Sequence, residues 1–270
     1  MSDPRPQGLA PKPSRRIYLL PNALTTASLF AGFYAIIQAM NQHFEQAAVA
    51  IFVSMVLDGL DGRVARLTNT QSAFGEQYDS LSDMVAFGVA PAVVVYEWAL
   101  RGLGKWGWIA AFIYVAGAAL RLARFNTNIG VVDRRFFQGL PSPASGAMIA
   151  GLIWVATDLF ETRWISATGA DLAWLAWFMT VYAGVTMVSN APFYSFKTFN
   201  LRRSVPFIFV LALVLIFALI STDPPLVLFT LFMAYGVSGY VLWAWRWQSR
   251  RRRAGPGPSG DVGTPPPGAG

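Results

Sequence analysis

The sequence predicts an all-α integral membrane protein with about eight transmembrane helices. Hydrophobic residues make up 54% of the 270 residues and the mean hydropathy is +0.43, which is too apolar for an ordinary soluble domain of this size. Several apolar runs are long enough to span a bilayer. Ten Trp and nine Tyr, many of them near the ends of these runs, are typical of the aromatic belts at membrane interfaces.

The chain divides into a membrane domain, 17–247, and two polar tails. The Pro-rich residues 1–16 are expected to be disordered, and so are residues 248–270, where four consecutive arginines precede a Pro- and Gly-rich end that could lie against anionic lipid. The first apolar run is longer than the core of a signal peptide, so it is interpreted as a retained helix. The expected spans are approximately residues 18–40, 44–67, 75–100, 106–120, 144–160, 172–189, 205–220 and 226–247.

Basic residues are distributed unevenly between the two sides that these spans define. With both termini on one side, all of the 21 Lys and Arg residues except Arg101, Lys105 and Arg163 fall on that side. By the positive-inside rule this is the cytoplasmic side. The net charge of +7 is therefore explained by topology and by affinity for anionic head groups, and nucleic acid is not expected as a partner. Cysteine is absent, which excludes a thiolate metal site or a thiol nucleophile.

Four aspartates stand in one polar stretch, residues 58–83, where the second and third spans meet the cytoplasmic face. Asp58 and Asp61 are three residues apart and Asp79 and Asp83 are four apart, so each pair lies on one helical face. Two charges about 5 Å apart repel by roughly 3 kcal/mol at an effective dielectric near 20. Four ionised carboxylates can therefore converge only around cations. All-oxygen ligation favours hard ions, so two Mg²⁺ or Mn²⁺ ions are expected.

This stretch resembles the signature of the CDP-alcohol phosphatidyltransferase family, D-x-x-D-G-x-x-A-R-x(8)-G-x-x-x-D-x-x-x-D. All eight specified positions are present without a gap or a substitution: Asp58, Asp61, Gly62, Ala65, Arg66, Gly75, Asp79 and Asp83. Eight specified positions at fixed spacing make a chance match very improbable. The resemblance implies attack of an alcohol hydroxyl on the lipid-side phosphorus of a CDP-linked lipid, with release of CMP. It also suggests a homodimer, for which no residue pattern gives independent evidence.

The resemblance implies a role for each position. Asp58, Asp61 and Asp79 are expected to be metal ligands, and Asp83 a ligand that also serves as the general base. The residues expected to bind the nucleotide of the CDP-lipid are Gly62, Ala65, Arg66 and Gly75, together with Asn22, Thr25 and Ser72. An alternative for Asn22 and Thr25 is helix capping and anchoring at the membrane interface.

Three further segments resemble the bacterial phosphatidylserine synthase branch of the family, beginning at Leu67, Leu120 and Gly139. The branch implies CDP-diacylglycerol and L-serine as substrates and a bacterial inner membrane location. Arg121, Arg124, Asn126 and Ser142 are candidates for contacts with the acceptor alcohol. The two arginines share a helical face and could pair with a carboxylate or a phosphate, although ordinary flanking charges are an alternative interpretation.

Two alternatives remain open at this point. Glycerol 3-phosphate or inositol phosphate would also suit the arginines, and choline shares the family signature, so charge alone does not identify the acceptor. A cation-coupled transporter is the alternative from a different class, since carboxylates within a membrane often mark ion pathways. The transporter interpretation does not account for the glycine, alanine and arginine positions of the signature.

Overall fold

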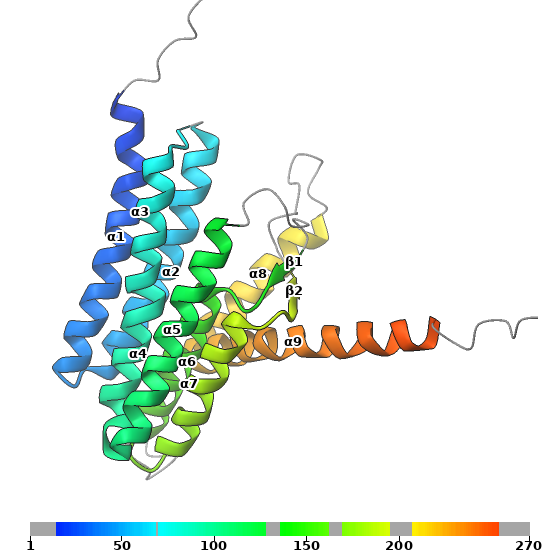
Figure 1. Ribbon diagram of the computed structural model, residues 1–270. Coiled ribbons are helices and arrows are strands. Elements are labelled where there is room, and N and C mark those ends of the chain that lie inside the picture. Colours follow the sequence, from blue (N-terminus) through cyan, green and yellow to red (C-terminus); the bar gives the residue numbers. More distant parts are fainter. Residues whose placement is uncertain (1–14, 69, 128–135, 162–168, 195–206, 254–270) are drawn as a thin grey trace, which may run out of the picture.

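The computed structural model describes residues 15–68, 70–127, 136–161, 169–194 and 207–253, which form a bundle of helices with one small sheet (Figure 1). The helices are α1 (Arg15–Met40), α2 (Phe44–Leu67), α3 (Ala73–Asp83), α4 (Ala90–Val95), α5 (Lys105–Thr127), α6 (Ser142–Glu161), α7 (Ala173–Val188), α8 (Phe207–Thr222) and α9 (Pro224–Arg253). The strands are β1 (Phe136–Gln138) and β2 (Pro192–Tyr194).

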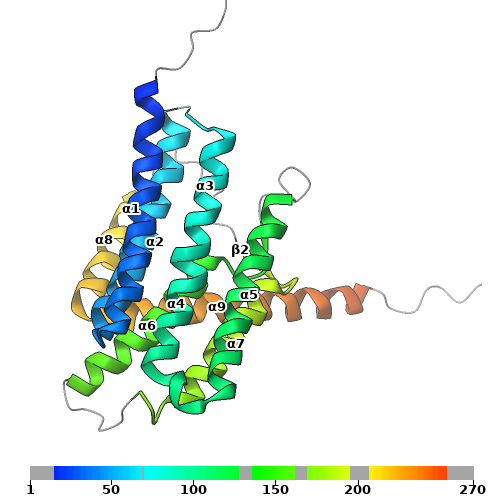
Figure 2. The same cartoon turned by 60° about the vertical axis from the view of Figure 1, so that its left-hand side comes forward.

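Helix α1 packs against both α2 and α3, and α2 and α3 carry the residues of the signature (Figures 1 and 2). A tight turn containing Gln42, whose φ is 65°, reverses the chain between α1 and α2. Across the α1–α2 contact, the buried hydroxyls of Ser28 and Ser54 hydrogen-bond to each other at 2.8 Å. A short loop then leads into α3, which runs back along α1 and faces α2 across the aspartates. The two halves of residues 58–83 therefore face each other.

The helix that begins with α3 continues past Asp83 as far as Leu103, but parts of it are not α-helical. Residues Met84–Val89 and Tyr96–Leu100 are π-helical and Arg101–Leu103 is a 3₁₀ turn. A π-helical turn shifts the backbone hydrogen-bond pattern, so a carbonyl can accept from elsewhere. Here the buried hydroxyl of Tyr114 on α5 donates to the carbonyl of Phe87 at 2.9 Å. This bond holds α5 against the helix just after Asp83.

Glycines allow the helices to approach each other closely. A Cβ atom on Gly32 of α1 would lie 2.6 Å from the Cα atom of Ala86. A Cβ on Gly117 of α5 would collide with the carbonyl oxygen of Gly184 on α7. Close backbone packing through small residues is typical of helices that associate within membranes.

The second half of the chain completes the bundle. Helix α6 packs between α2 and α9, and α7 packs against α5. Strands β1 and β2 pair antiparallel with Phe137 opposite Phe193, which ties the segment before α6 to the segment after α7. Helix α9 runs across the other helices and projects from the bundle in both views (Figures 1 and 2).

The helices account for the apolar composition. Each predicted span contains a described helix, and the helices long and apolar enough to cross a membrane are Leu19–Met40, Ala73–Leu103, Lys105–Thr127 and Pro224–Trp245. Helix α7 is apolar but shorter. The chain is therefore a helical integral membrane protein, while the number of eight spans stays a prediction.

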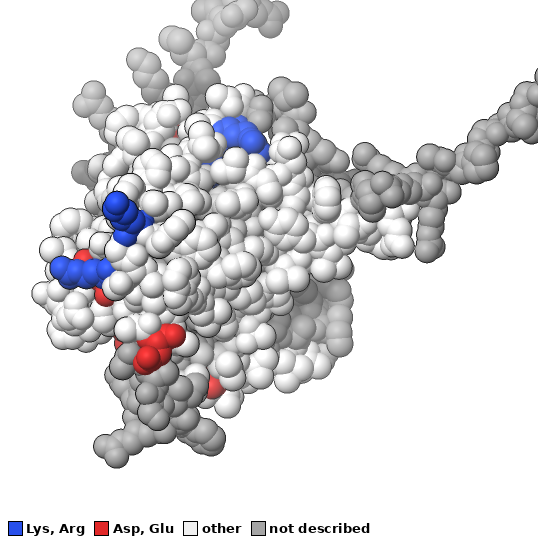
Figure 3. All heavy atoms as spheres, turned by 60° about the horizontal axis from the view of Figure 1, so that its bottom comes forward, with Lys and Arg blue, Asp and Glu red and all other residues white. Residues whose placement is uncertain are grey.

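The surface supports this conclusion. Figure 3 shows a face that is mostly uncharged, with only a few basic and acidic side chains. Large apolar side chains are exposed on several helices, among them Phe30, Leu81 and Phe217. Exposed apolar area of this extent is expected where helices face lipid rather than water.

The described helices differ from the predicted segments at their ends. Helix α1 begins at Arg15, α5 continues to Thr127, and α9 continues to Arg253 instead of ending at residue 247. Arginine is a strong helix former and its charge is favourable at a helix C-terminus, which explains the last extension. The all-α expectation omits β1 and β2, because strands of three residues have no detectable periodicity. The remainder of the predicted tails, 1–14 and 254–270, lies outside the described residues.

Candidate active site

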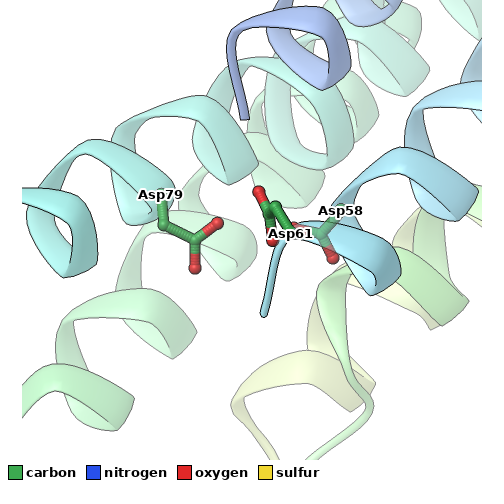
Figure 4. Close-up of side chains that lie close together, drawn as sticks. All are labelled: Asp58, Asp61 and Asp79. Atoms are coloured by element: carbon green, nitrogen blue, oxygen red, sulfur yellow. The ribbon is translucent and has the colours of Figure 1, made fainter. Parts of the chain in front are cut away.

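The aspartates of the two signature halves come together between α2 and α3. Asp58 and Asp61 of α2 and Asp79 of α3 each offer a carboxylate oxygen, and these three oxygens lie within 4.8 Å of one another. Figure 4 shows the three side chains pointing toward a common space. Asp61 is the most enclosed, with only 4% of its surface exposed. The predicted convergence is thus present in the fold.

Asp83 adjoins the same cluster. Its side chain hydrogen-bonds to that of Asp58 and lies close to Asp79 and Arg121. Asp83 therefore lies beside the other three predicted aspartates.

The donor set fits hard divalent cations. Oxygen ligands of one Mg²⁺ lie at about 2.1 Å from the ion, hence within about 4.2 Å of each other. Ions in two-metal sites are about 3.5–4 Å apart. The three oxygens lie within 4.8 Å of one another, slightly wider than this limit, so a small inward movement of the side chains would let them surround one ion, or they could bridge two. The absence of thiol and imidazole groups from this cluster also favours Mg²⁺ or Mn²⁺ over softer metals.

Three of the predicted nucleotide contacts gather at the start of α3. Ser72 caps this helix, and its Oγ accepts a hydrogen bond from the backbone N–H of Gly75 at 3.0 Å. A Cβ atom on Gly75 would lie 3.5 Å from Oδ1 of Asn22 on α1. Gly62 on α2 has no atom within 4 Å of the position of a Cβ, so it borders open space. Ala65 is half-buried on α2, and Arg66 is exposed in the last turn of that helix.

Thr25 occupies a different position from these residues. It is buried, with 4% of its surface exposed, and its Oγ1 donates a hydrogen bond to Oδ2 of Asp61 at 2.6 Å. The sequence suggested a nucleotide contact for Thr25, whereas in the structure its hydroxyl contacts a carboxylate of the cluster.

The two arginines predicted to contact the acceptor alcohol lie in different surroundings. Arg121 lies near Asp83 and Asp58, and its Nη1 donates to Oγ of the buried Ser142 at 2.7 Å. Arg124 instead donates to the carbonyl of Val188 at 3.1 Å and to Oδ1 of Asn190 at 3.2 Å, which ties α5 to the end of α7.

Asn126 has a contact of its own with the third helix. Its amide hydrogen-bonds to Oγ of Ser80 at 3.2 Å, which joins α5 to α3. The structure therefore brings Arg121 to the aspartates with Ser142 bonded to it, and it places Arg124 and Asn126 in contacts between helices.

Two residues near the site could not be identified as site residues from the sequence. Tyr235 of α9 lies near Arg121, yet a tyrosine within an apolar helix usually indicates a membrane interface or a packed core. Ser82 is buried and its Oγ donates to the carbonyl of Thr25 at 3.2 Å. It occupies an unspecified position of the signature, so only its place beside Asp83 could have drawn attention to it.

Comparison with known proteins agrees with the site. The model of the CDP-alcohol phosphatidyltransferase family matches residues 18–188. A Helicobacter pylori protein named CDP-diacylglycerol–serine O-phosphatidyltransferase is 37% identical over 234 residues, which are 86% of this chain and 93% of the relative. A Mycobacterium leprae protein of the same name is 34% identical over 228 residues, 81% of this chain and 72% of that protein. A Mycobacterium tuberculosis protein, also of this name, is 36% identical over 183 residues, 65% and 61% of the two chains.

Proposed function

Since the chain belongs to the CDP-alcohol phosphatidyltransferase family, we propose that it transfers a phosphatidyl group from CDP-diacylglycerol to the hydroxyl of L-serine, with release of CMP. The observation that carries this function is the eight-position signature, whose aspartates lie together beside Arg121 in the fold. Relatives that match most of the chain and are named for serine transfer favour serine over the other acceptor alcohols. A cation-coupled transporter is not favoured, because these relatives are named as transferases.

The reaction requires one bond to form and one to break at the lipid-side phosphorus. The oxygen of the serine hydroxyl bonds to this phosphorus, the bond to the bridging oxygen breaks, and CMP leaves with that oxygen. Two divalent ions, Mg²⁺ or Mn²⁺, held by Asp58, Asp61 and Asp79 would stabilise the charge on the diphosphate. Asp83 accepts the hydroxyl proton, since it lies beside these three carboxylates, which are called the carboxylate triangle below.

Arg121 is the group best placed for the serine carboxylate. It lies next to Asp83, and Ser142 fixes one of its guanidinium nitrogens at 2.7 Å. The planar guanidinium still has further N–H donors for a carboxylate. An acceptor held there would have its hydroxyl near the proposed base. Arg124 is assigned to the α5–α7 contact, because its donors bond to Val188 and Asn190.

Arg121→Gln is therefore expected to raise KM for serine about 10- to 100-fold, the equivalent of losing a hydrogen bond to a charged group. KM for CDP-diacylglycerol should change little. Arg124→Gln is the matched control, because it removes the same charge one helical turn away, and it should leave KM for serine nearly unchanged. Equal increases of KM for serine in the two variants, measured in steady-state assays, would contradict the placement of the serine carboxylate at Arg121.

The nucleotide is proposed to lie over Gly62 and Gly75, near Asn22. Gly62→Leu tests this placement, because the free protein has room for the side chain and leucine favours a helix. The expected result is an unchanged melting temperature with KM for CDP-diacylglycerol at least about 10-fold higher, or about 1.4 kcal/mol. Gly59→Leu on the same helix also enters open space but lies outside the signature, so it should leave KM unchanged. Equal effects of both variants would contradict the placement.

The side of the membrane on which the site lies is inferred from the uneven distribution of Lys and Arg residues. With the basic side of the chain in the cytoplasm, the aspartates would meet soluble serine there while the acyl chains remain in the bilayer. A bacterial inner membrane and a homodimer are proposed on the basis of the family resemblance.

An assay of purified protein tests the function as a whole. CDP-diacylglycerol would be combined with Mg²⁺ or Mn²⁺ and, separately, with serine, glycerol 3-phosphate, inositol phosphate or choline, and the release of CMP followed. CMP release is expected with serine and with none of the other alcohols. CMP release with one of the other alcohols but not with serine would support the same chemistry and refute serine as the acceptor.

A further inference from the structure

Thr25 connects helices α1, α2 and α3 beside the aspartate cluster. Its side chain on α1 donates to Oδ2 of Asp61 on α2 at 2.6 Å. Its backbone carbonyl accepts a hydrogen bond from Oγ of Ser82 on α3 at 3.2 Å. Thr25, Asp61 and Ser82 are all buried, with at most 4% of each surface exposed. Both contacts are therefore screened from water.

The hydroxyl of Thr25 is held in one orientation. Threonine is branched at Cβ, which restricts its χ1 angle in a helix. Its hydroxyl also lies 3.1 Å from the carbonyl of Pro21, but Oδ2 of Asp61 at 2.6 Å is the closer acceptor. A carboxylate has about four lone-pair positions, so one bond from Thr25 leaves the others for a cation. The contact thus fixes the carboxylate without occupying it.

The second contact acts on the other half of the cluster. Ser82 directly precedes Asp83 on α3, and Asp79 lies one turn earlier on this helix. The bond from Ser82 to the carbonyl of Thr25 ties this part of α3 to α1. One residue of α1 therefore connects the helices that carry both pairs of aspartates.

We propose that Thr25 is a positioning residue for the metal site. It orients Asp61 through its hydroxyl and sets the spacing between α2 and α3 through its carbonyl. This inference rests on the metal-dependent function proposed above. It differs from the nucleotide contact that the sequence suggested for Thr25, because the buried hydroxyl already donates its one proton to Asp61 and cannot also donate to a nucleotide. Groups that orient metal ligands typically contribute 10- to 100-fold in metal affinity.

The test measures Mn²⁺ binding to the purified full-length protein by electron paramagnetic resonance, without substrates. Thr25→Val keeps the shape of the side chain and removes the hydroxyl, so it should weaken Mn²⁺ binding about 10- to 100-fold. Thr25→Ser restores the hydroxyl and should recover most of the affinity. Ser28→Ala is the matched control, since it removes an α1–α2 hydrogen bond one turn away that touches no carboxylate. Its Mn²⁺ affinity should equal that of the wild type.

Steady-state assays at saturating Mn²⁺ provide the second readout. Thr25→Val should then show an unchanged KM for CDP-diacylglycerol, whereas a raised KM would mean that Thr25 contacts the nucleotide and would overturn the inference. Equal Mn²⁺ affinity of Thr25→Val and the wild type, or equal weakening in Ser28→Ala, would also overturn it. Should Thr25→Val fail to fold, the smaller Thr25→Ala carries the same expectation. Wild-type protein that binds no Mn²⁺ would instead refute the metal site itself.

Discussion

Asp79→Asn is expected to lower serine-dependent CMP release by about 10³-fold, the upper end of the loss caused by removing one electrostatic contact to the reacting group. Asp79 is the member of the carboxylate triangle that α3 contributes, so the substitution removes the charged ligand on that side of the site. The amide has nearly the same shape but no charge to balance a divalent ion. Mn²⁺ binding measured without substrates should weaken in parallel.

A neighbouring acidic residue supplies the control for Asp79. Glu76 lies one turn earlier on α3 and is exposed, outside the triangle. Glu76→Gln removes one negative charge from the same helix and should keep activity within about twofold, because a solvated surface charge contributes little. If Glu76→Gln were as inactive as Asp79→Asn, the loss would reflect the charge of the helix rather than a ligand. A fully active Asp79→Asn would refute the metal site.

Asp83→Asn is expected to show a different defect, a kcat lower by about 10²- to 10⁴-fold, the usual contribution of general acid–base catalysis. Binding of CDP-diacylglycerol should largely persist, because Asp58, Asp61 and Asp79 still form the triangle of ligands. The asparagine cannot accept the proton of the attacking hydroxyl. Single-turnover assays together with a direct binding measurement separate the two effects. Loss of CDP-diacylglycerol binding to the same extent as turnover would show that Asp83 is chiefly a ligand.

The aspartate cluster could be predicted from the sequence because it depends on local geometry. Spacings of three and four residues place Asp58 with Asp61, and Asp79 with Asp83, on single faces of α2 and α3. A short loop makes these helices antiparallel neighbours, so only one further assumption, that the faces meet, was needed. The helices themselves were predicted from the length of each apolar run.

The division of the acceptor candidates could not be predicted in this way. Arg121 and Arg124 share a helical face and have identical chemistry, and only the packing of α5 against α7 determines that Arg124 meets Val188 and Asn190. The role inferred for Thr25 likewise depends on contacts with residues far away in the chain. The π-helical segment after Asp83 has no sequence pattern of its own, and its contact with Tyr114 is visible only in the fold.

The most direct test of the central claim follows one oxygen atom through the reaction. Serine labelled with ¹⁸O in its hydroxyl would be incubated with CDP-diacylglycerol, Mn²⁺ and purified protein, and both products analysed by mass spectrometry. Attack by the serine hydroxyl on the lipid-side phosphorus predicts that phosphatidylserine carries the label and that equimolar CMP carries none. Unlabelled phosphatidylserine, or release of CMP without any serine-containing lipid, would contradict the proposed reaction.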